Sequence, residues 1–72
     1  MAYVPDYQRI VNDIRAEIDS GALVDGDRLP SIRQLRGRYG VSEQPVRMAH
    51  VVLRTEGLTE GRQGRGVFVR RR

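Results

Sequence analysis

The chain is 72 residues long, contains 13 arginines, no lysine, no cysteine and one histidine, and carries a formal net charge of +4. This length allows one small domain with a modest core, and the missing thiols exclude disulfides and thiolate metal sites. Because no apolar run approaches the ~20 residues that span a bilayer and no signal-peptide pattern opens the chain, we expect a cytoplasmic protein without membrane contact. Because a single histidine has no partners at a catalytic or metal-binding spacing, we expect no enzymatic activity, metal or cofactor.

The charge is distributed unevenly along the chain. The formal charges of residues 1–32 sum to −3, whereas those of residues 33–72 sum to +7. A genomic preference for GC-rich codons could explain arginine in place of lysine, but it does not explain this asymmetry. A one-sided positive field attracts a polyanion and orients it on approach. The distribution therefore favours a polyanionic partner for the second half.

The first predicted element is an amphipathic helix that follows a loose arm at residues 1–5. Asp6 is the expected N-cap, and Ser20-Gly21 is the expected end because glycine accepts the left-handed conformation common at helix C-termini. Apolar residues recur at helical spacing and predict one buried stripe, which comprises Tyr7, Ile10, Val11, Ile14 and Ile18.

Two shorter helices are predicted over residues 31–39 and 42–56, after a turn and an extended segment at Leu29. Ser31 and Gln34 have the spacing of a capping box at the start of the first. Ser42 is the expected cap of the second, and Pro45 is tolerated in its first turn.

A small hairpin is predicted after the third helix. Its strands are expected at residues 58–62 and 66–70, on either side of a Gln63-Gly64-Arg65 tip. The predicted fold class is therefore mainly α with a small β-hairpin (α+β). It is a winged helix-turn-helix of three helices and a two- or three-stranded wing, forming one domain over 1–72 with flexible ends at 1–5 and 70–72.

Several motifs occur together in a specific order between residues 7 and 69. They are Leu29-Pro30-Ser31, Arg33-Gln34-Leu35, Tyr39-Gly40-Val41-Ser42, Val46-Arg47, Ala49, Leu53, Glu56-Gly57-Leu58 and Gln63-Gly64-Arg65-Gly66-Val67-Phe68-Val69. This pattern resembles the N-terminal winged helix-turn-helix domain of the GntR family of bacterial transcription regulators. The resemblance implies a module that binds an operator as one half of a dimer, beside a C-terminal domain for dimerisation and effector binding.

No counterpart of that C-terminal domain is present in these 72 residues, so the chain is either a small regulator or an isolated domain. The resemblance implies sequence-specific binding to double-stranded DNA and regulation of transcription, more often by repression. It places the recognition helix, 42–56, in the major groove and the wing, 61–66, on the backbone or minor groove. A homodimer on an inverted-repeat operator is an expected assembly.

The candidate DNA-binding residues lie on the two last helices and the wing tip. They are Arg33, Ser42, Glu43, Gln44, Pro45, Arg47, Gln63, Gly64 and Arg65. Arg33 and Arg47 match family contact positions, and arginine can bind O6 and N7 of guanine with two hydrogen bonds. Arg65 could enter the minor groove or bind a phosphate, or it could simply be a charge on a flexible tip.

Glu43 departs from the family, in which this position is often basic or polar. Its carboxylate could accept a hydrogen bond from cytosine N4, or it could simply favour the positive end of the helix dipole. Gln44 could read adenine, and Pro45 could touch a thymine methyl. The departure means that the family's usual operator sequence cannot be transferred to this chain.

The remaining interpretations concern His50, three further arginines, the wing glycines and the class of partner. His50 is expected to be a partly buried structural residue, with a pH-sensitive contact as the alternative. Arg36, Arg38 and Arg62 are weaker candidates for phosphate contact. The glycines of the wing precede a strand and no Gly-Lys-Ser/Thr follows, so nucleotide binding is excluded. The alternative to DNA binding is a winged-helix module for protein–protein interaction.

Overall fold

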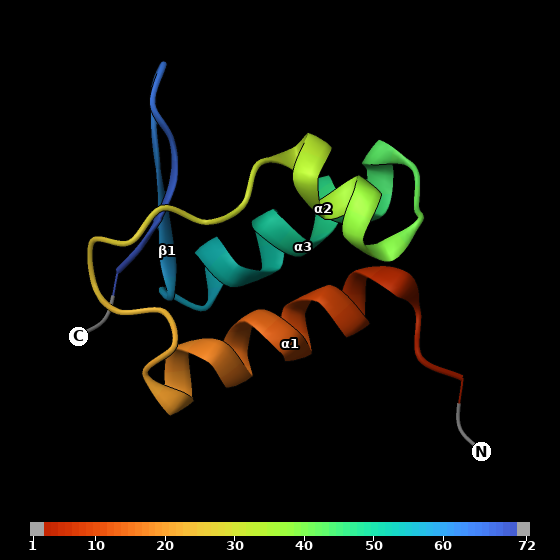
Figure 1. The fold of residues 1–72 in the computed structure, drawn as a ribbon, viewed down its shortest axis with the longest axis horizontal. Helices are drawn as coiled ribbons and strands as arrows, with labels where there is room; N and C mark the ends of the chain where they lie inside the picture. The colour runs from red at the N-terminus through yellow and green to blue at the C-terminus, as the bar shows by residue number, and fades with distance from the viewer. Residues whose placement is uncertain (1–2, 71–72) are drawn as a thin grey trace.

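The computed structural model describes residues 3–70 and confirms the predicted winged helix-turn-helix. Three helices are followed by one hairpin: α1 (Asp6–Ser20), α2 (Ile32–Tyr39), α3 (Glu43–Thr55), β1 (Thr59–Arg62) and β2 (Gly66–Val69). The helices lie together and the hairpin stands beside the end of α3 (Figure 1). The predicted flexible ends fall partly on residues 1–2 and 71–72, which lie outside the described residues.

The core lies mainly between α1 and α3. The predicted apolar stripe of α1 is buried through Ile10, Val11, Ile14 and Ile18, whereas Tyr7 is only partly buried at its edge. The opposing face of α3 contributes Val46, Ala49 and Leu53, and the other buried hydrophobic residues are Leu29, Leu35 and Val69. Burial of one such aliphatic side chain stabilises the fold by roughly 1.5–3 kcal/mol. This packing fixes α3 on α1, and α2 and β1 pack against other parts of α3.

The start of α1 differs from the prediction. Pro5, not Asp6, occupies the N-cap position, with an extended backbone (φ −58°, ψ 151°), and its carbonyl accepts a hydrogen bond from the Arg9 amide at 3.1 Å. The fixed φ of proline suits this position. Asp6 is instead the first helical residue, where a carboxylate is favoured by the positive end of the helix dipole.

The predicted capping box of α2 is confirmed. The Ser31 hydroxyl accepts a hydrogen bond from the Gln34 amide at 3.1 Å, and the Gln34 carboxamide accepts one from the Ser31 amide at 2.9 Å. Gly40 ends the helix in the left-handed conformation (φ +64°). Ser42 is the N-cap of α3, as predicted. The Ser42 side chain makes no capping hydrogen bond to the first turn of this helix.

The wing is a two-stranded antiparallel sheet in which Thr59 pairs with Val69 and Arg62 with Gly66. Each strand is one residue shorter than predicted. The segment before α2 supports the sheet: the Leu29 amide donates to the Val67 carbonyl and the Val69 amide to the Asp27 carbonyl, both at 2.8 Å. These long-range bonds attach the wing to the helical core.

Gly66 is required by the backbone at the start of β2. Its φ is +118°, and a Cβ atom there would lie 2.8 Å from Nε of Arg28. The glycine therefore allows the arginine side chain to cross the wing. None of the helices within residues 3–70 is both long and apolar enough to cross a membrane.

Candidate nucleic-acid interface

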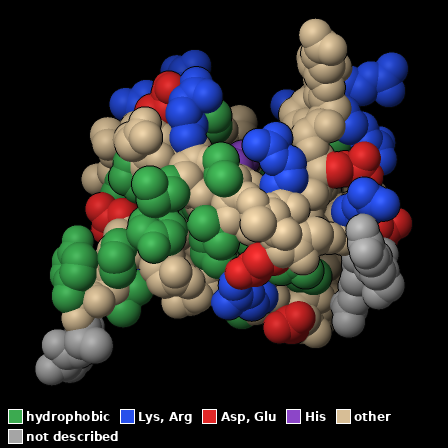
Figure 2. All heavy atoms as spheres, turned by 180° about the vertical axis from the view of Figure 1, so that it is seen from behind, with side chains coloured by type: hydrophobic (Ala, Val, Ile, Leu, Met, Phe, Trp, Pro, Cys, Tyr) green, Lys and Arg blue, Asp and Glu red, His purple; other side chains and the backbone are tan. Residues whose placement is uncertain are grey.

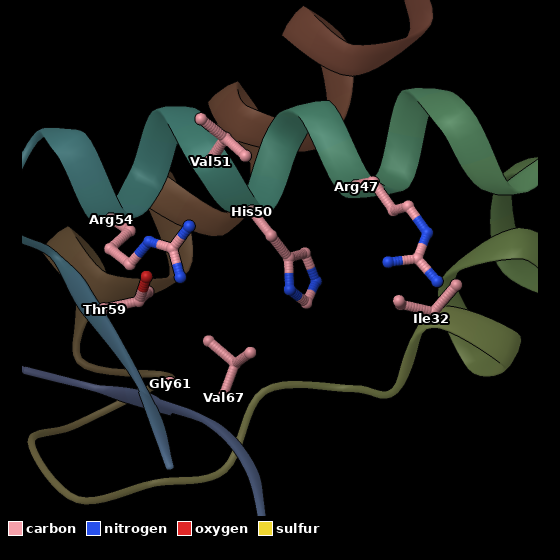
Figure 3. Close-up of a pocket in the computed structure, with 8 residues that line it drawn as sticks. All are labelled: Ile32, Arg47, His50, Val51, Arg54, Thr59, Gly61 and Val67. Atoms are coloured by element: carbon pink, nitrogen blue, oxygen red, sulfur yellow. The ribbon is translucent and has the colours of Figure 1, made fainter. Parts of the chain in front are cut away.

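One side of α3 carries all four of its ionisable side chains. Glu43, Arg47, His50 and Arg54 follow one another at intervals of four, three and four residues, so they share one side of the helix. Arg47, His50 and Arg54 line a hollow of about 380 Å³ between α3 and the wing, together with Ile32, Val51, Thr59, Gly61 and Val67 (Figure 3). We call this hollow the α3–wing groove.

Glu43 and Arg47 form an ion pair within α3. The Nε atom of Arg47 donates to the Glu43 carboxylate across one helical turn. The terminal nitrogens of Arg47 donate no hydrogen bond within residues 3–70, and its side chain remains 59% exposed. Glu43 therefore orients the arginine while leaving the end of its guanidinium accessible. The four-residue spacing that signals such pairs was present in the sequence.

The first turn of α3 presents the other candidate residues of the recognition helix. Ser42 and Gln44 are exposed, and Pro45 is partly buried. The Ser42 hydroxyl accepts no capping bond, and the Gln44 carboxamide makes no hydrogen bond within residues 3–70. These polar groups are therefore accessible to a ligand at the start of the helix.

Arg33 lies on the first turn of α2 and is exposed. It lines a second hollow, which it shares with Arg28, His50, Gly66 and Val67. Because His50 and Val67 also line the α3–wing groove, the two hollows adjoin. The structure therefore brings Arg33 and Arg47, from two different helices, to the same side of the molecule.

The wing contains two arginines, Arg62 in β1 and Arg65 at the tip, whose contacts differ. Arg62 stacks on the Phe68 ring at 4.6 Å from its centroid and lies 3.7 Å from the Glu60 carboxylate. Arg65, together with Gln63 and Gly64, is exposed at the tip, and it forms no ion pair within the described residues. Arg62 thus stiffens the hairpin, whereas Arg65 is available.

The turn at the tip has the expected form. Gly64 adopts φ +75°, and the Arg65 amide donates to the Arg62 carbonyl at 2.9 Å. Of the two arginines of α2 that were weaker candidates, Arg38 lies 3.8 Å from the Glu17 carboxylate of α1, whereas Arg36 is exposed without an ion pair in residues 3–70.

His50 is partly buried, as expected, and its Nε2 atom is inaccessible to solvent and has no hydrogen-bond partner among residues 3–70. Burial lowers the pKa of this imidazole below its ordinary value of 6.5, and the positive charges of Arg54 and Arg47 lower it further. Seen from behind in Figure 2, arginine side chains rim the hollow between the helices and the wing, and the histidine is visible within it.

Two arginines of this surface were not among the sequence candidates. Arg54 lines the α3–wing groove, and Arg28 lines the adjoining hollow. The position of Arg54 could have been found from the helical spacing to Arg47 and His50. The position of Arg28 could not have been found in this way, because it depends on the β-bridge between Arg28 and Phe68 of the wing.

Both the sequence and the fold of this chain are similar to those of known bacterial regulators. The family model described as bacterial regulatory proteins, gntR family, matches residues 6–69. The chain is 40% identical over 63 residues to the Uxu operon regulator of Haemophilus influenzae, an alignment that covers 88% of this chain and 24% of that protein. It is 37% identical over 70 residues to the mannosyl-D-glycerate transport/metabolism system repressor MngR of Escherichia coli K12, covering 97% and 29%.

Among solved structures, AraR(DBD) in complex with operator ORR3 matches with a TM-score of 0.89 and 29% identity, covering 94% of this chain and 82% of that one. The chain thus spans about a quarter of the length of the curated relatives but most of the length of this domain. The chain belongs to the GntR family of bacterial regulatory proteins, and its three helices and wing form the winged helix-turn-helix domain of that family.

Proposed function

We propose that this chain binds double-stranded DNA in a sequence-specific manner and regulates transcription. The observation that carries the proposal is the convergence of α2, α3 and the wing on one surface where exposed arginines surround the α3–wing groove. Within residues 3–70, no aspartate or glutamate lines this groove or the hollow beside it. Such a surface complements the phosphate charge of DNA.

The first turns of α3 enter the major groove in this proposal. The free end of the Arg47 guanidinium binds O6 and N7 of guanine, while Glu43 holds its Nε atom. Gln44 is placed to read adenine, and Ser42 and Pro45 complete the contact surface. Since Glu43 is engaged by Arg47, its main effect is to fix the arginine, although a free carboxylate oxygen could still accept from cytosine N4.

The wing contributes phosphate or minor-groove contacts. Arg65 and Gln63 reach the DNA from the exposed tip, and Gly64 allows a close approach of the backbone. Arg33 approaches the backbone from the start of α2. These contacts add affinity that depends strongly on salt and little on base sequence.

The regulatory role follows from the family. We propose that the chain acts in the cytoplasm as a repressor and not as an enzyme, that residues 1–72 work as one DNA-binding domain, and that two copies bind an inverted repeat. The relative MngR is named a repressor, which supports repression over activation. The acidic residue Glu43 at the tip of α3 is the feature that favours the interaction-module alternative, and its pairing with Arg47 weakens that argument.

Selection of bound duplexes from a randomised DNA pool at near-physiological salt tests the proposal. Enrichment of an inverted repeat would support recognition by two copies, and enrichment of one half-site would support recognition by a monomer. Binding without any enrichment, lost as the salt concentration rises, would contradict sequence-specific recognition. Absence of binding even at low salt would contradict DNA binding itself.

A further inference from the structure

His50 is the one side chain of the α3–wing groove that can change its charge near neutral pH. Its ring projects from α3 toward Val67 of the wing (Figure 3). Its Nε2 atom and the hydroxyl of Thr59, a residue that is 3% exposed, are both buried without a hydrogen-bond partner within residues 3–70. The floor of the groove therefore contains polar groups whose bonding capacity the free protein leaves unused.

The charged side chains that line the two hollows beside His50 are all arginines, and Glu43, on the same side of α3, is paired with Arg47. From its own helix, Arg47 and Arg54 line the groove with it. From the segment before α2 and the first turn of α2, Arg28 and Arg33 line the adjoining hollow. The strands contribute Thr59, Gly61, Gly66 and Val67, which carry no charge, and no carboxylate lines either hollow within residues 3–70.

We propose that DNA binding by this chain is linked to protonation, and that His50 gains a proton when a backbone phosphate enters the α3–wing groove. The inference rests on the proposed function and adds to it a residue that is outside the set of direct DNA contacts. It requires no direct bond between the phosphate and the imidazole. The phosphate charge needs only to offset the surrounding arginines.

The direction of the linkage follows from the charges. In the free protein, burial and the neighbouring arginines favour neutral imidazole, so the pKa of His50 lies below 6.5. A phosphate brings negative charge to the groove and raises that pKa in the complex. The DNA-bound state then binds more protons than the free state, and its formation is favoured as the pH falls.

Affinity for the selected duplex measured between pH 5.5 and 7.5 at constant ionic strength tests the proposal. With one histidine and no cysteine in the chain, few other groups titrate in this window. We expect the folded protein to bind several-fold tighter at pH 5.5 than at pH 7.5, because the complex takes up a proton as the pH falls. Circular dichroism at each pH verifies that the protein is folded.

The His50→Leu variant removes the titrating group and fills its place in the groove with an apolar side chain. We expect its affinity to change less than twofold over the same range. An equal pH dependence in His50→Leu and in the original chain would overturn the proposal. If this variant does not fold, His50→Gln serves the same comparison.

NMR titration of the imidazole in the original chain gives a direct readout that requires no variant. We expect the pKa of His50 to be higher with the duplex bound than without it. An unchanged or lower pKa in the complex would overturn the proposal. Tight, sequence-specific binding with no pH dependence would overturn this inference alone, whereas loss of all DNA binding at every pH would contradict the proposed function.

Discussion

Two surfaces of this small domain use arginine in opposite ways. Around α1, arginines are paired with carboxylates: Arg15 donates to Glu56 at 2.6 Å, Arg38 lies 3.8 Å from Glu17, and Arg9 lies 3.7 Å from Asp6. On the proposed binding surface, Arg33 of α2 and Arg65 of the wing tip form no ion pair within residues 3–70. The arginines around α1 use their terminal nitrogens in these pairs, whereas Arg47, which pairs with Glu43 through Nε, keeps its terminal nitrogens unpaired within residues 3–70.

The pairs around α1 also tie the helices together. Arg15 joins α1 to the end of α3, and the Tyr39 hydroxyl of α2 donates to the Asp13 carboxylate at 2.6 Å. Burial and the neighbouring Asp13 carboxylate raise the pKa of Tyr39 to about 12, so this hydrogen bond persists through the neutral range. These contacts lie at the exposed edge of the core and orient α2 and α3 on α1.

Replacement of Arg47 by alanine should have the largest effect on DNA binding. We expect a loss of ~1–3 kcal/mol with the selected duplex and relaxed preference at one base pair, because a bidentate contact to guanine is removed. Fluorescence anisotropy with duplexes that vary this base pair measures both effects. Arg9→Ala is the matched control, since it removes the same charge from α1. An equal loss in both variants would mean that Arg47 contributes charge alone.

Replacement of Arg65 by alanine should weaken binding by about 1 kcal/mol on every duplex. The expected cause is the loss of one phosphate or minor-groove contact, so the dependence of log Kd on log salt should fall by about one. A salt titration with the selected duplex and a scrambled one measures this slope. A loss restricted to the selected duplex would show that the wing reads sequence directly.

Replacement of Glu43 by glutamine should change specificity more than affinity. Removal of the carboxylate reduces repulsion of phosphates and frees the Arg47 side chain, so the scrambled duplex should bind a few-fold tighter. The ratio of the two dissociation constants, for scrambled and selected DNA, should therefore fall. An unchanged ratio would contradict the orienting role of Glu43.

Replacement of Tyr39 by phenylalanine should have the smallest effect, and on stability only. The variant loses the hydrogen bond to Asp13, which at this exposed edge contributes about 0.5–1 kcal/mol to the free energy of unfolding. Urea denaturation measures that change. DNA affinity should remain within twofold, and a larger loss would place the α1 side of the molecule in the interface.

Local signals made most of the fold predictable from the sequence. The apolar spacing of α1, the Ser31–Gln34 capping box and the glycine that ends α2 each act within one or two helical turns, and the structure contains them. The prediction of Asp6 as a cap was wrong because Pro5 can occupy the same position with its own preferred φ. Both residues fit the start of a helix, and the sequence pattern did not separate them.

The candidate site was predictable only in part. The family pattern identified Arg33, Arg47 and Arg65, whose role as DNA contacts stays a prediction. The pairing of Glu43 with Arg47 follows a known helical spacing and could have been anticipated. In contrast, the pairing of Arg15 with Glu56 depends on how α1 packs against α3, since 41 positions separate them in the chain. Long-range packing thus decides which arginines remain free.

Amide chemical-shift mapping of the ¹⁵N-labelled chain with the selected duplex locates the DNA interface residue by residue. We expect perturbations to concentrate at the start of α2, the first turns of α3 and the wing tip at residues 63–65. The exposed side of α1 should change little. Perturbations centred on α1, with the wing and the start of α3 unaffected, would contradict the assignment of the α3–wing surface as the DNA interface.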